Sequence, residues 1–473
     1  MPVRIEHAVE NTTPAANQAA KRMFIKSYGC QMNVYDGLRM AELLTPLGYE
    51  LQDAADGADL VILNTCHIRE KADDKMFSDI GRFRKTAADN AIIAVGGCTG
   101  QALGAKLMQQ APAVSIVFGP QTYHRLPEFI EKVETGRTQR AAGHKNAPIR
   151  VSDTDFPELE KFDKLPQANS YGPSAFLTIQ EGCDKFCTYC VVPYTRGAEI
   201  SRPVNHILEE AQEMAENGTR ELVLLGQNVN AYHGEDVDGN EVTLAKLLDK
   251  LAEIEGIARL RFVTSHPQNT TQDLMEAFRD NPKLMPFFHL PVQAGSNKIL
   301  QAMNRSHTAE EYLAILDKVR EYCPDIAMSG DFIVGFPGET EEDYQQTLAI
   351  AHASKYVYAY SFAYSPRPGT PAADMPNQVP EDIKKERLAG LQAVLDNSQE
   401  EFNKTFEGKT IEVLVEEMGG KIDQLRGRSP HNVAVNFTTG LTSEKLNRRL
   451  IGDILKVKIT EAGAKSLMGE LIS

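Results

Sequence analysis

Three cysteines within eight residues constrain this chain more than any other feature of its sequence. Cys183, Cys187 and Cys190 have the spacing C-x-x-x-C-x-x-C and follow an apolar run, 175–179, that is typical of a β-strand. Three thiolates on one tight loop can ligate three irons of a [4Fe–4S] cluster and leave the fourth iron open. A structural zinc site is the alternative, but it needs a fourth Cys or His at short spacing, and the nearest histidine is His206.

The segment from Ala175 to about Tyr364 repeats the pattern of a strand followed by a helix. The expected strands are 175–179, 221–225, 260–264, 287–290, 327–334 and 356–362. Six such units are fewer than the eight of a closed barrel, so we expect a partial, open-sided (β/α)6 barrel. The active loops of such a barrel lie at the carboxyl ends of its strands, which is where the cysteine triplet falls.

The first segment of the chain also alternates strand and helix, and it carries a second set of cysteines. Apolar runs at 23–27, 60–63, 92–95 and 115–118 lack polar alternation, which predicts a parallel sheet covered on both faces. The first three runs are each followed by a cysteine: Cys30, Cys66 and Cys98. Parallel strands end at one edge of a sheet, so we expect these thiols to converge on a site. The alternative is that each is a small buried residue at a strand end.

The C-terminal tail changes character. Runs at 412–415, 432–437 and 455–460 are β-branched or alternating and are separated by turns, which predicts a small β-barrel. The whole chain has 50 Lys and Arg against 65 Asp and Glu, but the tail is nearly neutral. Either the basic residues of the tail form a face that binds RNA or they are solvated surface charges. These residues are Arg426, Arg428, Lys445, Arg448, Arg449, Lys456 and Lys458.

Together these patterns divide the 473 residues into five parts. We expect a disordered lead-in (1–20), an α/β domain (21–133), a polar linker (134–173), a barrel with a closing helix (174–405) and a β module (406–473). No apolar run approaches the roughly 20 residues of a membrane-spanning helix. Residues 1–20 lack the apolar core of a signal peptide, so a cytoplasmic protein without a membrane partner is expected.

Several stretches taken together resemble the methylthiotransferase family of the radical S-adenosylmethionine (SAM) superfamily. In the N-terminal half they are Ser-Tyr-Gly-Cys-Gln-Met-Asn at 27–33, Asn-Thr-Cys-His-Ile-Arg-Glu-Lys-Ala at 64–72, Gly-Gly-Cys at 96–98 and Cys-Thr-Tyr-Cys-Val-Val-Pro-Tyr-Thr-Arg-Gly at 187–197. In the C-terminal half they are Ser-His-Pro-Gln at 265–268, His-Leu-Pro-Val-Gln-Ala-Gly-Ser at 289–296, Asp-Phe-Ile-Val-Gly-Phe-Pro-Gly-Glu-Thr at 331–340 and Tyr-Ser-Pro-Arg-Pro-Gly-Thr at 364–370.

The resemblance covers nearly the whole chain and implies an order of domains and cofactors. It implies an N-terminal domain with an auxiliary [4Fe–4S] cluster on Cys30, Cys66 and Cys98. It implies a radical SAM barrel whose cluster is held by Cys183, Cys187 and Cys190, and a C-terminal TRAM domain that binds RNA. SAM would serve as methyl donor and as radical source. No catalytic residue is assigned beyond the cluster cysteines. The candidate SAM contacts are Tyr189, Gly226, Gln227, Ser265, Gln293 and Asp331, and the alternative is that these residues only stabilise or pack loops.

The reaction implied by the resemblance is transfer of a methylthio group to C2 of N6-isopentenyladenosine at position 37 of tRNA. A C2–H bond is neither acidic nor a hydride source, so acid–base catalysis alone would fail there. The enzyme would also need a low-potential electron donor and a sulfur donor. Two alternatives within the family are threonylcarbamoyladenosine in tRNA and an aspartate of a ribosomal protein. An alternative of another class is a non-catalytic iron–sulfur or zinc protein that binds RNA or passes electrons.

Overall fold

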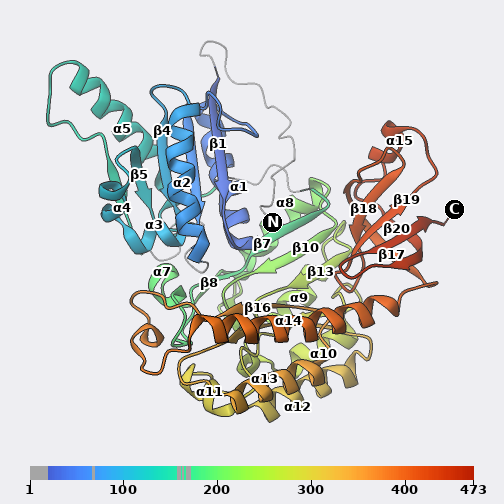
Figure 1. Ribbon diagram of the computed structural model, residues 1–473. Helices are drawn as coiled ribbons and strands as arrows, with labels where there is room; N and C mark the ends of the chain where they lie inside the picture. The colour runs from blue at the N-terminus through green and yellow to red at the C-terminus, as the bar shows by residue number, and fades with distance from the viewer. Residues whose placement is uncertain (1–19, 67–69, 157–160, 162–163, 167–171, 473) are drawn as a thin grey trace. The chain divides into compact units, whose positions relative to one another are not determined.

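A computed structural model of the chain describes residues 20–66, 70–156, 161, 164–166 and 172–472 (Figure 1). The chain forms two compact units. One comprises Met1–Ser170, Glu181–Asp184 and Val191–Ile200, and the other comprises Tyr171–Gln180, Lys185–Cys190 and Ser201–Ser473. The expected lead-in, apart from Ala20, lies outside the described residues. In the described part of the chain, no helix has the length and apolar character needed to cross a membrane.

The first unit is built on a parallel sheet with the strand order β2-β1-β3-β4-β5-β6. Three of its four inner strands, β3, β4 and β5, are buried along their whole length, as their unbroken apolar runs predict. The strands are β1 (Lys21–Ser27), β2 (Tyr49–Leu51), β3 (Leu60–Thr65), β4 (Ile92–Gly96), β5 (Val114–Phe118) and β6 (Val151–Asp153).

Helices cover both faces of this sheet (Figure 1). On one face, α1 (Gln31–Leu44) and α5 (Leu126–Ala141) bury side chains such as Met40 and Phe129. On the other face, the core includes Met76 and Leu107 from two further helices. These are α2 (Glu70–Thr86) and α4 (Ala105–Gln110). Two further short helices belong to this unit, α3 (Gly97–Leu103) and α7 (Val192–Arg196), and they pack on each other.

The segment expected to be a linker, 134–173, is partly built into this unit. Helix α5 continues through it to Ala141, and β6 pairs with β5 as the last strand of the sheet. The sequence signal was weak because β6 has only three residues and is partly exposed at a sheet edge. Glycine and proline around it favour a linker, but strand pairing overrides that local preference.

The second unit contains six parallel barrel strands in two three-stranded sheets, ordered β13-β10-β7 and β14-β15-β16. All six coincide with expected strands. They are β7 (Ser174–Thr178), β10 (Glu221–Leu225), β13 (Arg259–Phe262), β14 (Phe287–His289), β15 (Ala327–Val334) and β16 (Tyr358–Ala363). The helices between them are α8 (Val204–Glu216), α9 (Leu244–Ala252), α10 (Gln272–Asp280), α11 (Asn297–Ala302), α12 (Ala309–Tyr322) and α13 (Glu341–Ser354). The closing helix α14 (Glu381–Lys404) packs on β16.

The C-terminal module is a closed five-stranded barrel with the order β17-β18-β19-β21-β20, which confirms the expected β-barrel. Its core is formed by side chains such as Val413, Leu425 and Phe437. The strands are β17 (Thr410–Met418), β18 (Gln424–Arg428), β19 (Ala434–Thr438), β20 (Ile454–Ala462) and β21 (Leu467–Leu471). A short helix, α15 (Glu444–Arg448), precedes β20.

Two buried arginines of β13 attach this module to the larger barrel. Arg259 Nη1 donates to the backbone carbonyl of Arg428 at 2.9 Å. Arg261 donates to the carbonyls of Ser429 and Pro430 at 2.8 and 2.6 Å. All these acceptors are main-chain oxygens, so these hydrogen bonds are made to the backbone at the end of β18 and in the loop that follows it.

Candidate iron–sulfur sites

The three N-terminal cysteines lie just beyond the carboxyl ends of adjacent strands. Cys30 is the N-cap of α1, three residues after β1. Cys66 follows β3 directly, and Cys98 is the second residue of α3, after β4. Because β3 pairs with both β1 and β4, the sheet brings all three thiols to one edge.

Two glycines with positive φ let these loops approach each other closely. Gly29 has φ +96°, and a Cβ at this position would lie 2.3 Å from Cys66 Cβ. Gly97 has φ +82°, and its Cβ would lie 2.3 Å from the carbonyl oxygen of Thr65. A side chain at either position would therefore both strain the backbone and push the cysteine loops apart.

The electrostatics of this edge favour a thiolate. The Cys66 thiol forms a hydrogen bond with Cys30 that lowers the pKa of Cys30 to about 6, and the charge of Arg196 acts in the same direction against burial. Burial raises the pKa of Cys98, although Arg196 again opposes the rise. Thiolates are the form of cysteine that binds metal, so the donor set fits an iron–sulfur cluster.

The second set of thiols lies on one loop after β7. Cys190 donates its backbone N–H to the carbonyl of Cys187 at 2.9 Å, which forms a tight turn. Arg305 Nη1 lies 3.7 Å from Cys187 Sγ, while its Nη2 donates to the carbonyl of Pro291 at 2.7 Å. Asn304 Nδ2 donates to the carbonyl of Phe186 at 3.0 Å. The segment that follows α11 thus holds the part of the loop around Cys187.

Cys183 belongs to the short segment 181–184, and its N–H donates to the carbonyl of Gly197 at 3.3 Å. Cys187 is buried, whereas Cys183 and Cys190 are partly exposed. Among the described residues, no three Cys, His, Asp or Glu side chains are placed to hold a single metal ion. A [4Fe–4S] cluster makes a different demand, because each thiolate binds its own iron.

Two of the expected SAM contacts lie in the turn after β10. A Cβ on Gly226 would lie 2.5 Å from Gln180 Oε1, so glycine leaves room for that side chain. Gln180 Oε1 in turn accepts the N–H groups of Gln227 at 2.8 Å and Asn228 at 3.1 Å. The turn is therefore fixed by the side chain of Gln180, two residues after the first barrel strand β7.

Three other expected contacts also follow or lie within barrel strands. Ser265 follows β13, and its buried hydroxyl has no hydrogen-bond partner among the described residues. Gln293 donates its N–H to the carbonyl of Asp331 at 2.9 Å, so the backbone brings these two residues together. The Asp331 carboxylate lies 3.5 Å from His289 Nε2. Tyr189 differs from them, because it packs against the hydrophobic cluster that contains Phe336.

Three arginines of the C-terminal barrel pair with glutamates, and three of its basic residues line one hollow. Arg448 lies 2.7 Å from Glu444, and Lys445, Arg448 and Arg449 line a hollow of about 560 Å³ together with that glutamate. Arg426 and Arg428 pair with Glu417 and Glu416 at 3.1 and 3.3 Å, and Lys456 lies on β20 opposite Glu412. Lys445, Arg448 and Arg449 are thus three basic residues of the tail that share one hollow.

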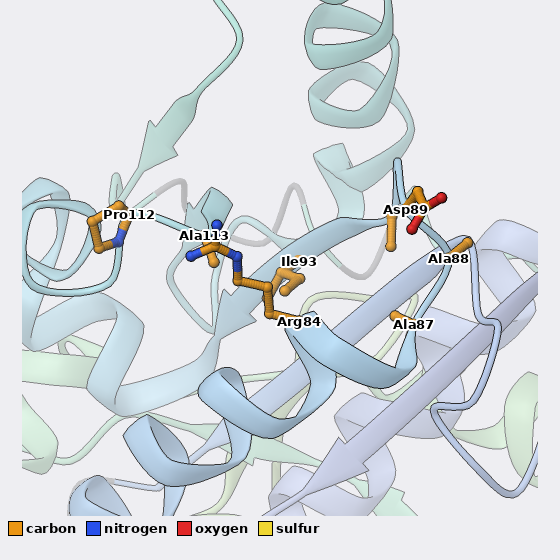
Figure 2. Close-up of a pocket in the computed structure, with 8 residues that line it drawn as sticks. Arg84, Ala87, Ala88, Asp89, Ile93, Pro112 and Ala113 are labelled. Carbon is orange, nitrogen blue, oxygen red and sulfur yellow. The ribbon is translucent and has the colours of Figure 1, made fainter.

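A separate cavity lies at the other end of the N-terminal sheet. It has a volume of about 200 Å³ and is lined by Arg84, Asp89, Ile93 and Pro112, among others (Figure 2). Asp89 precedes β4 and Pro112 precedes β5, so the cavity is at the amino ends of these strands. The cysteines follow the carboxyl ends, so this cavity does not belong to the thiol site.

Sequence reasoning missed the two arginines that approach the thiols. Arg196 lies in the stretch Tyr-Thr-Arg-Gly and Arg305 lies in Met-Asn-Arg-Ser, without a role assigned to either. Their partners are 160 residues away in the case of Asp36 and 118 residues away in the case of Cys187. The only available signal for Arg196 was its position six residues after Cys190.

Two solved structures are similar to this chain in fold. Both are of the radical S-adenosylmethionine methyltransferase TsrM from Kitasatospora setae. The structure with cobalamin and a [4Fe–4S] cluster has a TM-score of 0.54 at 13% identity, covering 75% of this chain and 74% of that one. The structure with tryptophan and a SAM analogue has a TM-score of 0.53 at 14% identity, covering 75% of each chain.

Family comparisons follow the same division of the chain. Residues 22–119 match the Uncharacterized protein family UPF0004, residues 177–351 the Radical SAM superfamily and residues 404–472 the TRAM domain. The tRNA-2-methylthio-N(6)-dimethylallyladenosine synthase of Zymomonas mobilis is 51% identical over 452 residues, which are 96% of this chain and 97% of that protein. Identity at this level over nearly the full length places the chain in the tRNA-2-methylthio-N(6)-dimethylallyladenosine synthase family of radical SAM enzymes.

Proposed function

We propose that this protein adds a methylthio group to C2 of N6-isopentenyladenosine at position 37 of tRNA. The observation that carries the proposal is the second set of three thiols, Cys30, Cys66 and Cys98, at one sheet edge of a radical SAM enzyme. Radical formation needs one cluster, whereas insertion of sulfur needs a further site that holds the sulfur to be donated. The product named for the Zymomonas mobilis relative supplies the substrate.

Two [4Fe–4S] clusters are assigned to the two sets of thiols. When bound, the cluster on Cys183, Cys187 and Cys190 supplies the electron that cleaves SAM into methionine and the radical that removes the C2 hydrogen. Arg305 orients Cys187 and places a positive charge beside its sulfur. A cluster on Cys30, Cys66 and Cys98 would hold the sulfur to be donated, and SAM would supply the methyl group.

The residues at the strand ends of the barrel are suited to orient SAM and the base. Gln180 fixes the turn that presents Gly226 and Gln227. The buried Ser265 hydroxyl and the Asp331 carboxylate offer polar groups to the methionine or ribose part of SAM. Tyr189 supports the loop by packing.

The C-terminal barrel is proposed to bind tRNA mainly through phosphates. Lys445, Arg448 and Arg449 gather around one hollow, which suits an anionic backbone. The target adenosine lies in a loop of tRNA, so the base can leave the stack without melting a helix. A low-potential electron donor and a sulfur donor complete the list of partners.

The test is a reconstituted reaction on three substrates. The full chain is loaded anaerobically with iron and sulfide and given SAM, a low-potential reductant and an anticodon stem-loop whose adenosine carries isopentenyl, threonylcarbamoyl or no group. Mass spectrometry of the nucleosides should show a methylthio gain only on the isopentenyl substrate. SAM cleavage without gain on any of the three RNAs would contradict the substrate, and no cleavage at full cluster content would contradict the reaction.

A further inference from the structure

A buried ion network connects α7 to the N-terminal sheet within the first compact unit. The guanidinium of Arg196, the last residue of α7, has its Nη2 2.8 Å from Asp36 Oδ2 and its Nη1 3.6 Å from Glu181 Oε1. Glu181 also pairs with Lys161 and accepts a hydrogen bond from Gln121 Nε2 at 2.6 Å. All four charged groups are buried, and Arg196 is only 2% exposed. A buried cation held from two sides keeps its position and its charge.

The same guanidinium also reaches the thiols. Helix α7, which ends at Arg196, packs on α3, the helix that carries Cys98. Arg196 Nη2 lies 3.3 Å from Asn33 Oδ1, and that oxygen is 3.5 Å from Cys30 Sγ. The carboxylates therefore hold the cation where it contacts Asn33 and, through Asn33, the Cys30 thiol.

We propose that Arg196 is a positioning residue for the auxiliary cluster, which fixes a positive charge against Cys30 and Cys98 and raises the potential of the cluster. This inference rests on the proposed auxiliary cluster. Reduction brings one electron from an external reductant and adds one negative charge to the cluster, so a fixed cation beside its sulfurs favours the reduced form. Net charge and hydrogen bonds to sulfur are two of the factors that set such potentials.

The position of Arg196 in the chain gives the inference a further consequence. Helix α7 begins two residues after Cys190, the last cysteine of the radical SAM triplet. The chain that leaves one set of thiols therefore supplies the cation of the other. A change in the triplet loop that displaced α7 would also change the charge beside Cys98.

The experiment isolates the auxiliary cluster in the full chain. The parent protein, in which all further substitutions are made, carries Cys183→Ala, Cys187→Ala and Cys190→Ala. It is reconstituted anaerobically with iron and sulfide. It is then titrated with a low-potential reductant, and electron paramagnetic resonance follows the reduced cluster. Arg196→Gln should decrease the equilibrium constant for one-electron reduction at least tenfold, about 59 mV. Arg196→Lys, which keeps the charge, should recover most of this shift.

Arg137→Met is the matched control for loss of an arginine from the same unit. Arg137 donates to the carbonyls of Asn90 and Ala91, which precede β4, whereas Cys98 follows that strand. The control should leave the potential unchanged. An equal shift in the control, or an unchanged potential in Arg196→Gln, would overturn the inference while leaving the auxiliary cluster in place.

A parent that binds no cluster would overturn the proposed auxiliary site and this inference with it. Arg196→Gln also leaves the buried Asp36 carboxylate without its ion-pair partner Arg196, and this unpaired charge can prevent cluster assembly. In that event Arg196→Gln/Asp36→Asn is compared with Asp36→Asn alone. The double variant should again have the lower potential, and equal potentials would overturn the inference.

Discussion

The two sets of thiols are presented in opposite ways. Cys30, Cys66 and Cys98 come from three strand ends that are far apart in the sequence, and parallel pairing brings them to one edge. Cys183, Cys187 and Cys190 come from one stretch of eight residues that crosses from one compact unit to the other. The first set depends on the register of a sheet, and the second depends on the conformation of a loop.

This difference determines what each set needs from its surroundings. The strand-end set needs clearance, which the positive-φ glycines Gly29 and Gly97 provide. The loop set needs support, which Arg305 and Asn304 provide through Cys187 and the backbone around Phe186. A buried cation next to sulfur is common to both, namely Arg196 in one and Arg305 in the other.

Removing one thiol from each set should separate the roles of the two sets. These two substitutions should have the largest effects on activity. Cys187→Ala should abolish SAM cleavage because its cluster loses a ligand. Cys66→Ala should retain SAM cleavage and lose methylthio transfer, because only the auxiliary site is affected. Mass spectrometry of 5′-deoxyadenosine and of the modified nucleoside measures the two steps. Full methylthiolation by Cys66→Ala would show that the strand-end set holds no donated sulfur.

Clearance in the strand-end set is tested by Gly29→Ala. The added Cβ meets Cys66 at 2.3 Å in a backbone with φ +96°, so we expect a loss of stability of about 2–5 kcal/mol and a loss of auxiliary iron. Gly48→Ala is the control, since Gly48 has φ +82° but nothing within 4 Å of its Cβ position. It should lose only about 1 kcal/mol and no iron. Iron content and thermal unfolding measure both, and equal iron in the two variants would contradict the clearance requirement.

Support of the loop set is tested by Arg305→Met. Losing the contact with Cys187 and the hydrogen bond to Pro291 should reduce SAM cleavage about 10- to 100-fold, as for other groups that orient metal ligands. Arg279→Met is the control, because Arg279 pairs with Asp280 on the exposed surface. Rates of 5′-deoxyadenosine formation compare the variants at equal protein content. A normal rate of SAM cleavage in Arg305→Met would show that the loop does not need Arg305 and is held by its backbone alone.

The smallest expected effect comes from Asp343, a buried carboxylate away from the cysteines, whose replacement should change only the stability of the fold. Hydrogen bonds from Lys298, Ser296 and Thr340 outweigh the effect of burial on Asp343 and lower its pKa to about 2. A lowered pKa stabilises the fold above pH 4, and this contribution disappears as the pH falls from about 4 to about 2. Asp343→Asn should therefore cost about 2 kcal/mol at pH 7 and less in acid. Urea unfolding at pH 7 and in acid measures the difference in unfolding free energy between Asp343→Asn and the original protein. A difference that does not change with pH would contradict the prediction.

The sequence predicts the parts of the fold that are marked by long apolar runs. All six barrel strands and the sheet strands β1, β3, β4 and β5 were expected. Strands β2 and β6 were missed because each has only three residues at a sheet edge. Strands β18 and β21 were missed because Gly427 and Gly469 interrupt their pattern where the barrel walls approach closely.

The candidate sites were predicted to a similar extent and for a similar reason. The cysteines are recognisable because their spacing, or their position after a strand, is local information. Arg196 and Arg305 are not recognisable, because their charges matter only once residues more than 100 positions away are brought beside them. Whether a buried arginine serves a metal site or an ordinary ion pair is decided by tertiary structure.

The joint between the larger barrel and the C-terminal module has a consequence for how such a protein can change. Arg259 and Arg261 bind main-chain oxygens of residues 428–430, and every amino acid supplies such an oxygen. Substitutions in that loop therefore leave the acceptors of the joint in place. The side chains of residues 428–430 can therefore change while these hydrogen bonds between the larger barrel and the C-terminal module remain.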